Sequence, residues 1–159
     1  MRTRISVQRA CEGWTVPENR ALRGWARAAL AGRRTEATLT VRVVGEDEGA
    51  ALNGRFRGKD GPTNVLSFAS EGIEAIDPAF LGDVVICAPL VIHEAREQRK
   101  AVQAHWAHLV VHGVLHLLGF DHGRQRQAAQ MEGLEIEILA RLGFSDPYAA
   151  PSPSVNEGS

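Results

Sequence analysis

Residues 101–122 read AVQAHWAHLVVHGVLHLLGFDH. This stretch predicts an apolar helix from about Ala101 to Leu118, ended by Gly119, because glycine can adopt the left-handed conformation that closes helices. Side chains four residues apart on a helix point within about 40° of each other and lie about 6 Å apart along its axis. His112 and His116 therefore form a two-point clamp suited to one metal ion.

A third ligand has to come from outside this helix. His108 lies on the same face, but about 12 Å of axis separates it from His116, which is too far for three ligands around one ion. A turn at Gly119 brings His122 back toward the pair, and the spacing His-x3-His-x5-His is that of metzincin-type zinc sites. We expect His112, His116 and His122 to bind one Zn²⁺ per chain and to leave a fourth position open. The alternative is a set of core or surface histidines on a helix that is rich in His.

The residue after the first histidine restricts the chemistry. Zinc peptidases of the His-Glu-x-x-His type carry their general base there, whereas this chain has Gly113. A metal ion can still lower the pKa of a bound water or polarise a phosphoryl oxygen. The site therefore suits a substrate that needs less help from a carboxylate, such as RNA, whose 2′-hydroxyl lies beside each phosphate.

Composition indicates one soluble domain. The chain has 159 residues, of which 44% are hydrophobic and 23% charged, and its net charge of -1 excludes a strongly basic nucleic-acid coat protein. No uncharged apolar run reaches the roughly 18 to 20 residues of a membrane span, and the first residues lack an export signal, so we expect no membrane partner. Two cysteines cannot form a disulfide scaffold, and a cytoplasmic location is expected.

Local patterns predict the elements and their order. Apolar alternation and compact apolar runs predict four strands, at Thr3–Arg9, Glu36–Val44, Val65–Phe68 and Gly82–Cys87. Helical spacing predicts five helices, at 17–32, 46–53, 89–100, 101–118 and 124–142. Residues 1–146 are expected to form a single catalytic domain, followed by a loose tail at 147–159 that is rich in Pro, Ser and Ala.

A basic segment lies in the first half of the chain. Residues 1–60 carry 12 Lys+Arg against 7 Asp+Glu, and residues 61–159 carry 6 against 12. The most basic short stretch is Gly54–Pro62, which reads as a loop containing Arg55, Arg57 and Lys59. We expect these three side chains to hold the backbone of a nucleic acid; the alternative is that they are solvated loop charges.

Four motifs in order carry a family resemblance. They are Leu52-Asn53 with Phe56-Arg57, Pro62–Phe68, Leu81–Val85 and His112–His122, and Met131, Glu132 and Glu135 follow on the last predicted helix. Together they resemble the YbeY family of bacterial single-strand-specific endoribonucleases, over about residues 39–148. The resemblance implies an α+β fold with a small mixed sheet of about four strands packed with about five helices, and a zincin-like metal site on a helix and the following turn.

The resemblance also implies a function. It implies a zinc-dependent endoribonuclease acting in 16S rRNA 3′-end maturation and ribosome quality control, with single-stranded RNA, rRNA precursors and the small ribosomal subunit with its proteins as partners. Arg57, with its planar fork of donors, is then the residue that faces the phosphate, and we expect it and His112 to be catalytic. The alternatives are a non-catalytic, metal-stabilised ribosome-assembly factor and a zinc metallopeptidase.

Three further side chains lie close to these motifs. His105 and His108 are expected to be buried or to line a cleft rather than to bind the metal. Asp121 either orients a ligand histidine or belongs to a turn.

Overall fold

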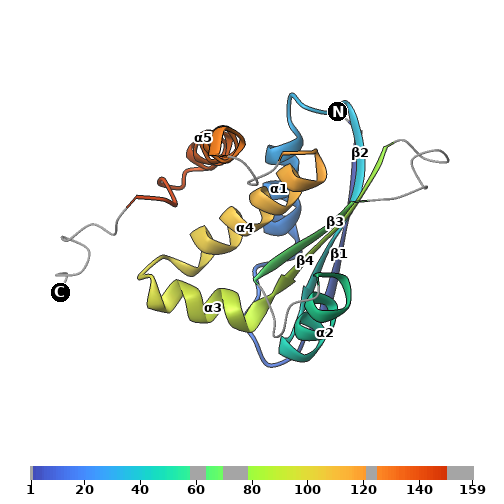
Figure 1. The fold of residues 1–159 in the computed structure, drawn as a ribbon, viewed down its shortest axis with the longest axis vertical. Helices are drawn as coiled ribbons and strands as arrows, with labels where there is room; N and C mark the ends of the chain where they lie inside the picture. Colours follow the sequence, from blue (N-terminus) through green and yellow to red (C-terminus); the bar gives the residue numbers. More distant parts are fainter. Residues whose placement is uncertain (1, 58–63, 70–78, 121–124, 150–159) are drawn as a thin grey trace.

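The computed structural model describes residues 2–57, 64–69, 79–120 and 125–149, which form a sheet of four strands and five helices (Figure 1). The strands are β1 (Arg2–Ala10), β2 (Glu36–Val44), β3 (Val65–Ala69) and β4 (Phe80–Cys87). The helices are α1 (Asn19–Leu30), α2 (Glu46–Arg57), α3 (Ala88–Glu97), α4 (Val102–Leu117) and α5 (Gln125–Arg141). The predicted α+β fold is therefore confirmed.

The sheet is mixed, and its strand order is β1-β2-β4-β3. β1, β2 and β4 run parallel, whereas β3 pairs antiparallel with β4. The parallel pair β1 and β2 is joined through α1, as such pairs require a crossover connection. β3 consequently lies at one edge of the sheet.

Helices cover both faces of the sheet. In β2, every second residue points toward α1 and α4 and is buried, and Leu39, Val41 and Val43 belong to this main core. On the opposite face, Val85 of β4 packs in a smaller cluster that includes Leu52 of α2. Figure 1 shows α1, α4 and α5 on one side of the sheet and α2 on the other.

The predicted loop at 54–62 is wrong in its first four residues. α2 continues through Gly54 to Arg57, so Arg55 and Arg57 lie on the last turn of a helix. A glycine costs only about 1 kcal/mol in a helix interior, and α2 has acidic residues in its first turn and arginines at its end, both of which suit the helix dipole. Lys59 lies outside the described residues.

The end of α4 has the predicted geometry. Gly119 has a φ of 101°, its N–H donates to His116 O at 3.0 Å, and the N–H of Phe120 donates to Leu115 O at 3.1 Å. These two bonds form the Schellman motif, which satisfies carbonyls left open at a helix end and reverses the chain. The residues that follow, including Asp121 and His122, lie outside the described residues.

The beginning of the predicted tail packs on the helical layer. Lys100 Nζ donates to the carbonyl of Pro147 at 2.8 Å, and the hydroxyl of Tyr148 reaches the carboxylate of Glu135. Residues 150–159 lie outside the described part of the chain. None of the described helices combines the length and the apolar character needed to cross a bilayer.

α4 packs unusually close to the sheet at Gly113. A Cβ atom at this position would lie 2.5 Å from Cγ1 of Val84 and 3.3 Å from Oγ of Ser67. Val84 is fully buried and its branched side chain has little freedom to move. The helix can therefore approach β3 and β4 this closely only because residue 113 has no side chain.

Gly113→Ala is expected to destabilise the fold by a net of up to about 2 kcal/mol. Overpacking a core costs about 1 to 3 kcal/mol, and the better helix propensity of alanine offsets about 1 kcal/mol. The matched control is Gly24→Ala in α1, where a Cβ meets nothing within 4 Å and stability should rise. Urea unfolding of both variants measures this; an equal gain in stability for both would show that the close approach is no constraint.

Candidate metal centre

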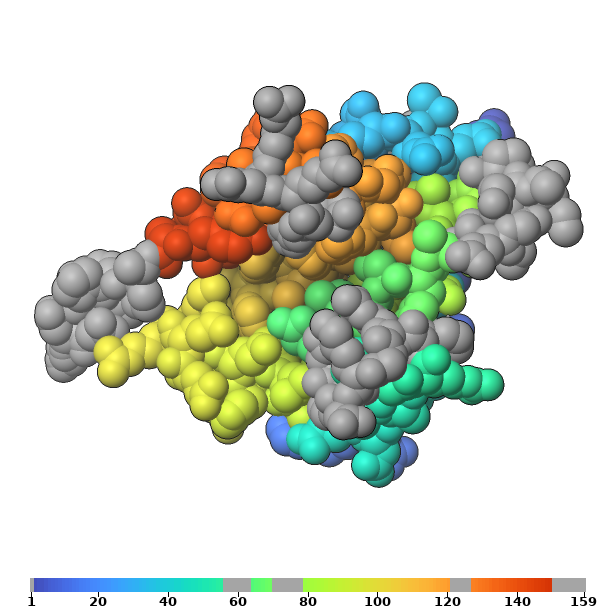
Figure 2. Space-filling view, viewed as in Figure 1, coloured from blue at the N-terminus to red at the C-terminus, as the bar shows by residue number. Residues whose placement is uncertain are grey.

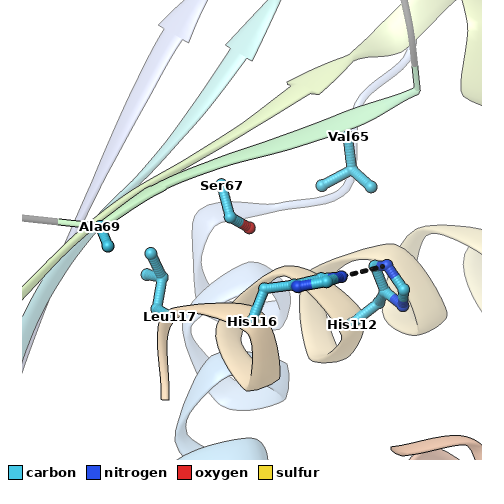
Figure 3. Close-up of a pocket in the computed structure, with 6 residues that line it drawn as sticks. All are labelled: Val65, Ser67, Ala69, His112, His116 and Leu117. Carbon is cyan, nitrogen blue, oxygen red and sulfur yellow. Dashed lines mark hydrogen bonds between the residues drawn. The ribbon is translucent and has the colours of Figure 1, made fainter. Parts of the chain in front are cut away.

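Two histidines of α4 point their ring nitrogens at each other. Nε2 of His112 lies 3.1 Å from Nε2 of His116, and both side chains face β3 (Figure 3). Two imidazoles bound to one Zn²⁺ through bonds of 2.0 to 2.1 Å at a tetrahedral angle hold their nitrogens about 3.3 Å apart. The spacing of the pair therefore fits two ligands of one ion, and the predicted two-point clamp has the required geometry.

The opposite side of His112 is held by a carboxylate. Nδ1 of His112 lies 2.6 Å from Oε2 of Glu135, whose side chain on α5 is fully buried. Because an ionised carboxylate only accepts hydrogen bonds, His112 donates its Nδ1–H, and this tautomer leaves the lone pair on Nε2. Glu135 thus sets both the orientation of His112 and the nitrogen with which it can bind a metal.

Glu135 remains ionised although it is buried. Burial acts to raise its pKa, but hydrogen bonds from His108, His112 and Tyr148 outweigh burial and lower the pKa to about 2. Nε2 of His108 donates to Oε1 of Glu135 at 2.8 Å. A buried carboxylate with this many donors carries a full negative charge beside the histidine pair at neutral pH.

Tyr148 completes the surroundings of this carboxylate. Its hydroxyl donates to Oε1 of Glu135 and lies 3.2 Å from Nε2 of His108. Burial, followed by the hydrogen bond to Glu135, raises the pKa of the Tyr148 phenol, so it stays protonated and donates at neutral pH. The segment after α5 therefore takes part in positioning His112.

A second set of candidate ligands shares His112. His108, His112 and Glu135 each offer one ligand atom within 4.8 Å of the others, so this cluster could hold a metal ion. The sequence predicts His108 to be buried, and it is 9% exposed. The sequence does not predict the contact of His108 with Glu135.

The other predicted side chains are distributed as follows. His105 is buried and its Nε2 bonds Oε1 of Glu94 at 3.0 Å, so it belongs to a different polar contact. Arg55 is exposed on α2, and the backbone of Arg57 ends the same helix. The assignments of His122 and Lys59 stay predictions, because both residues lie outside the described part of the chain.

Glu135 and Tyr148 are the residues of this centre whose role sequence reasoning missed. One signal was present for Glu135, since it lies on the same face of α5 as Met131 and Ile138, which are buried. A carboxylate at a core position of an amphipathic helix indicates a buried partner. Nothing in the sequence around Tyr148 distinguishes it from a residue of a loose tail.

A small pocket opens beside the histidine pair. It has a volume of about 170 Å³, and the described residues that line it belong to β3 and α4: Val65, Ser67, Ala69, His112, His116 and Leu117 (Figure 3). In Figure 2 the green atoms of β3 lie at the surface beside the orange atoms of α4. β3 and α4 are therefore neighbours on this face of the molecule.

Comparison with known proteins identifies the family of this chain. The family model described as endoribonuclease YbeY matches residues 12–143, which include α4 and most of the other elements. The chain belongs to the endoribonuclease YbeY family. Membership supports a role as an endoribonuclease, a hydrolase that acts on RNA.

Curated relatives cover nearly the whole chain. An endoribonuclease YbeY of Nitrosococcus oceani is 51% identical over 146 residues, which cover 91% of this chain and 95% of the relative. An endoribonuclease YbeY of Xanthomonas campestris pv. campestris is 52% identical over 153 residues, which cover 94% of this chain and 95% of that relative. The solution structure of TM1509 from Thermotoga maritima has the same fold, with a TM-score of 0.57 at 24% identity over 91% of this chain and 99% of that one.

Glu135→Gln is expected to lower the affinity for Zn²⁺ by about ten- to a hundredfold, the usual effect of losing a partner that orients a ligand histidine. The amide can accept from only one imidazole and places an N–H₂ group against the other donor. Competition with a chromophoric chelator measures the affinity. Glu137→Gln on the exposed side of α5 is the control, and equal affinities in the two variants would contradict the role of Glu135.

Proposed function

We propose that this protein is a zinc-dependent endoribonuclease that cuts single-stranded RNA, matures the 3′ end of 16S rRNA and acts in ribosome quality control. The observation that carries the proposal is the pair of Nε2 atoms of His112 and His116 at 3.1 Å, with Glu135 on the far side of His112. The partners are an rRNA precursor and the small ribosomal subunit with its proteins, and the location is the cytoplasm.

The proposed ligands are His112, His116 and His122, with one Zn²⁺ per chain. The alternative cluster of His108, His112 and Glu135 is less suitable, because direct hydrogen bonds of 2.6 and 2.8 Å already join the carboxylate to both imidazoles. In the proposed set these bonds persist and orient His112. Three neutral imidazoles leave one position for water or substrate, as in catalytic zinc sites.

The chemistry follows from the charges around the site. A bound Zn²⁺ supplies a Lewis acid that polarises a phosphoryl oxygen or lowers the pKa of water. The buried charge of Glu135 stabilises the cationic centre without contacting the substrate. Arg57 is proposed to donate two hydrogen bonds to the reacting phosphate, and Arg55 and Lys59 to hold the neighbouring backbone.

The packing of α4 argues against a metallopeptidase. The position that would carry the peptidase base is Gly113, and even a Cβ there would lie 2.5 Å from Val84. A glutamate cannot be accommodated without moving the helix that carries both histidines. The proposal of a non-catalytic assembly factor is less favoured, because the curated relatives are named endoribonucleases.

Metal-loaded protein is expected to cut an unstructured RNA oligonucleotide and to spare the same strand annealed to its complement. A duplex holds each 2′-hydroxyl and phosphate in a fixed A-form arrangement, whereas an unpaired strand can enter the pocket beside β3. Gel electrophoresis of labelled RNA measures cleavage, with His116→Ala as the inactive control and a peptide as the alternative substrate. Peptide hydrolysis, or no cleavage of any RNA, would contradict the proposed function.

Arg57→Ala is expected to reduce RNA cleavage by roughly two to three decades, on the order of 2 to 4 kcal/mol of transition-state stabilisation. Zinc content and the unfolding midpoint should not change, because α4 and α5 supply the partners of the histidine pair. The control is Arg20→Ala, an exposed arginine of α1. An Arg57→Ala protein with the activity of this control would show that Arg57 is a solvated surface charge.

A further inference from the structure

The free edge of β3 carries an ordered row of backbone hydrogen-bonding groups. The N–H of Cys87 donates to the carbonyl of Asn64 at 2.9 Å, and the register pairs Val65 with Ile86. Backbone groups of an antiparallel strand alternate between its two sides. The residues whose N–H and C=O point away from β4 are therefore Val65, Ser67 and Ala69, and no described strand pairs with this side.

The same three residues line the pocket of the histidine pair. Their side chains all lie on one face of β3, opposite His112, His116 and Leu117 of α4 (Figure 3). Outward-facing residues of a strand repeat about every 6.8 Å. The strand that carries the free edge and the helix that carries the candidate ligands thus line the same pocket.

Polar contacts hold this strand firmly against the helices. The hydroxyl of Ser67 donates to the carbonyl of Gly113 at 2.9 Å, within the stretch where α4 packs closest to the sheet. Before the strand begins, the amide of Asn64 donates to Oε1 of Glu94 at 3.0 Å, and Glu94 also contacts the buried His105. The edge is therefore fixed relative to the histidine pair before any substrate arrives.

We propose that the free edge of β3 binds the Watson–Crick edge of an unpaired nucleobase beside the scissile phosphate. Each outward residue offers one donor and one acceptor. A phosphate offers acceptors only and would leave the carbonyls unmatched, whereas a Watson–Crick edge offers both kinds of group. In a duplex that edge is occupied by the complementary base, so this strand selects single-stranded RNA. The inference rests on the proposed function and adds that β3 is the element that distinguishes unpaired from paired RNA.

The first test uses the unaltered, zinc-loaded protein and two substrates. They are oligouridylate and the same oligomer made of 3-methyluridine, in which a methyl group replaces the Watson–Crick N–H. We expect kcat/KM to be about tenfold lower for the methylated oligomer, with most of the effect in KM. Equal cleavage of the two would overturn the role of β3 and leave the proposed nuclease intact. Failure to cut either would contradict the nuclease itself, and with it the substrate assigned to this edge.

The second test changes the strand. Val65→Pro removes an outward N–H and none of the ladder hydrogen bonds, and proline is tolerated at edge positions whose N–H does not enter the ladder. It also removes the valine side chain, which packs against the core and lines the pocket. KM for oligouridylate should rise about three- to tenfold, the effect of losing one hydrogen bond, while zinc content and the circular dichroism spectrum stay unchanged. The matched control is Val7→Pro on β1, the opposite edge of the sheet. Ala69→Pro provides a second variant at the other end of the same row.

Combining the two tests separates substrate binding from a structural role. If the edge binds the base, methylation of the substrate should cost less in the Val65→Pro and Ala69→Pro proteins than in the unaltered one. A purely structural defect would lower cleavage of both oligomers by the same factor. If methylation lowers kcat/KM by the same factor in both variants as in the unaltered protein, the proposal is overturned.

Discussion

The closeness of α4 to the sheet is the constraint on which the rest of the site depends. At Gly113 the helix backbone lies so near Val84 that a single carbon atom cannot be added without displacing its neighbours. This contact sets the distance between β3 and the helix that carries His112 and His116. The hydrogen bond from the Ser67 hydroxyl to Gly113 sets the position of the helix along the strand. The contact at Gly113 also excludes the side chain on which a peptidase of similar histidine spacing depends, so the same packing that builds the pocket restricts its chemistry.

Electrostatics supports this geometry from the other side of the helix. A buried carboxylate is costly unless donors surround it, and Glu135 has three, from His108, His112 and Tyr148. Its negative charge lies behind His112, away from the pocket, where it favours a cation in front of the imidazole without competing for the substrate. Metal binding would thus offset part of the free-energy cost of burying the carboxylate. The packing of α5 on α4 would then be more stable when the metal is bound.

Much of this arrangement could be predicted from local patterns, because it depends on periodicity. The spacing of His112 and His116 follows from the helical repeat, and the turn at Gly119 from the conformational freedom of glycine. The four strands follow from apolar alternation and from compact apolar runs. The extension of α2 was missed because Gly54 was interpreted as a helix end, although the charges at both ends of the helix favour its continuation. The position of β3 at the sheet edge and the contact of Glu135 with His112 depend on long-range pairing, which spacing along the chain does not encode.

The contribution of Tyr148 has a consequence for how the centre forms during synthesis. Glu135 follows His112 by 23 residues, and Tyr148 follows His108 by 40. The histidines are therefore translated before the groups that orient them. The ligand geometry is completed only when the segment after α5 has been translated and has packed back on the helices. The order of translation thus delays completion of the proposed metal centre until nearly all of the described chain is present.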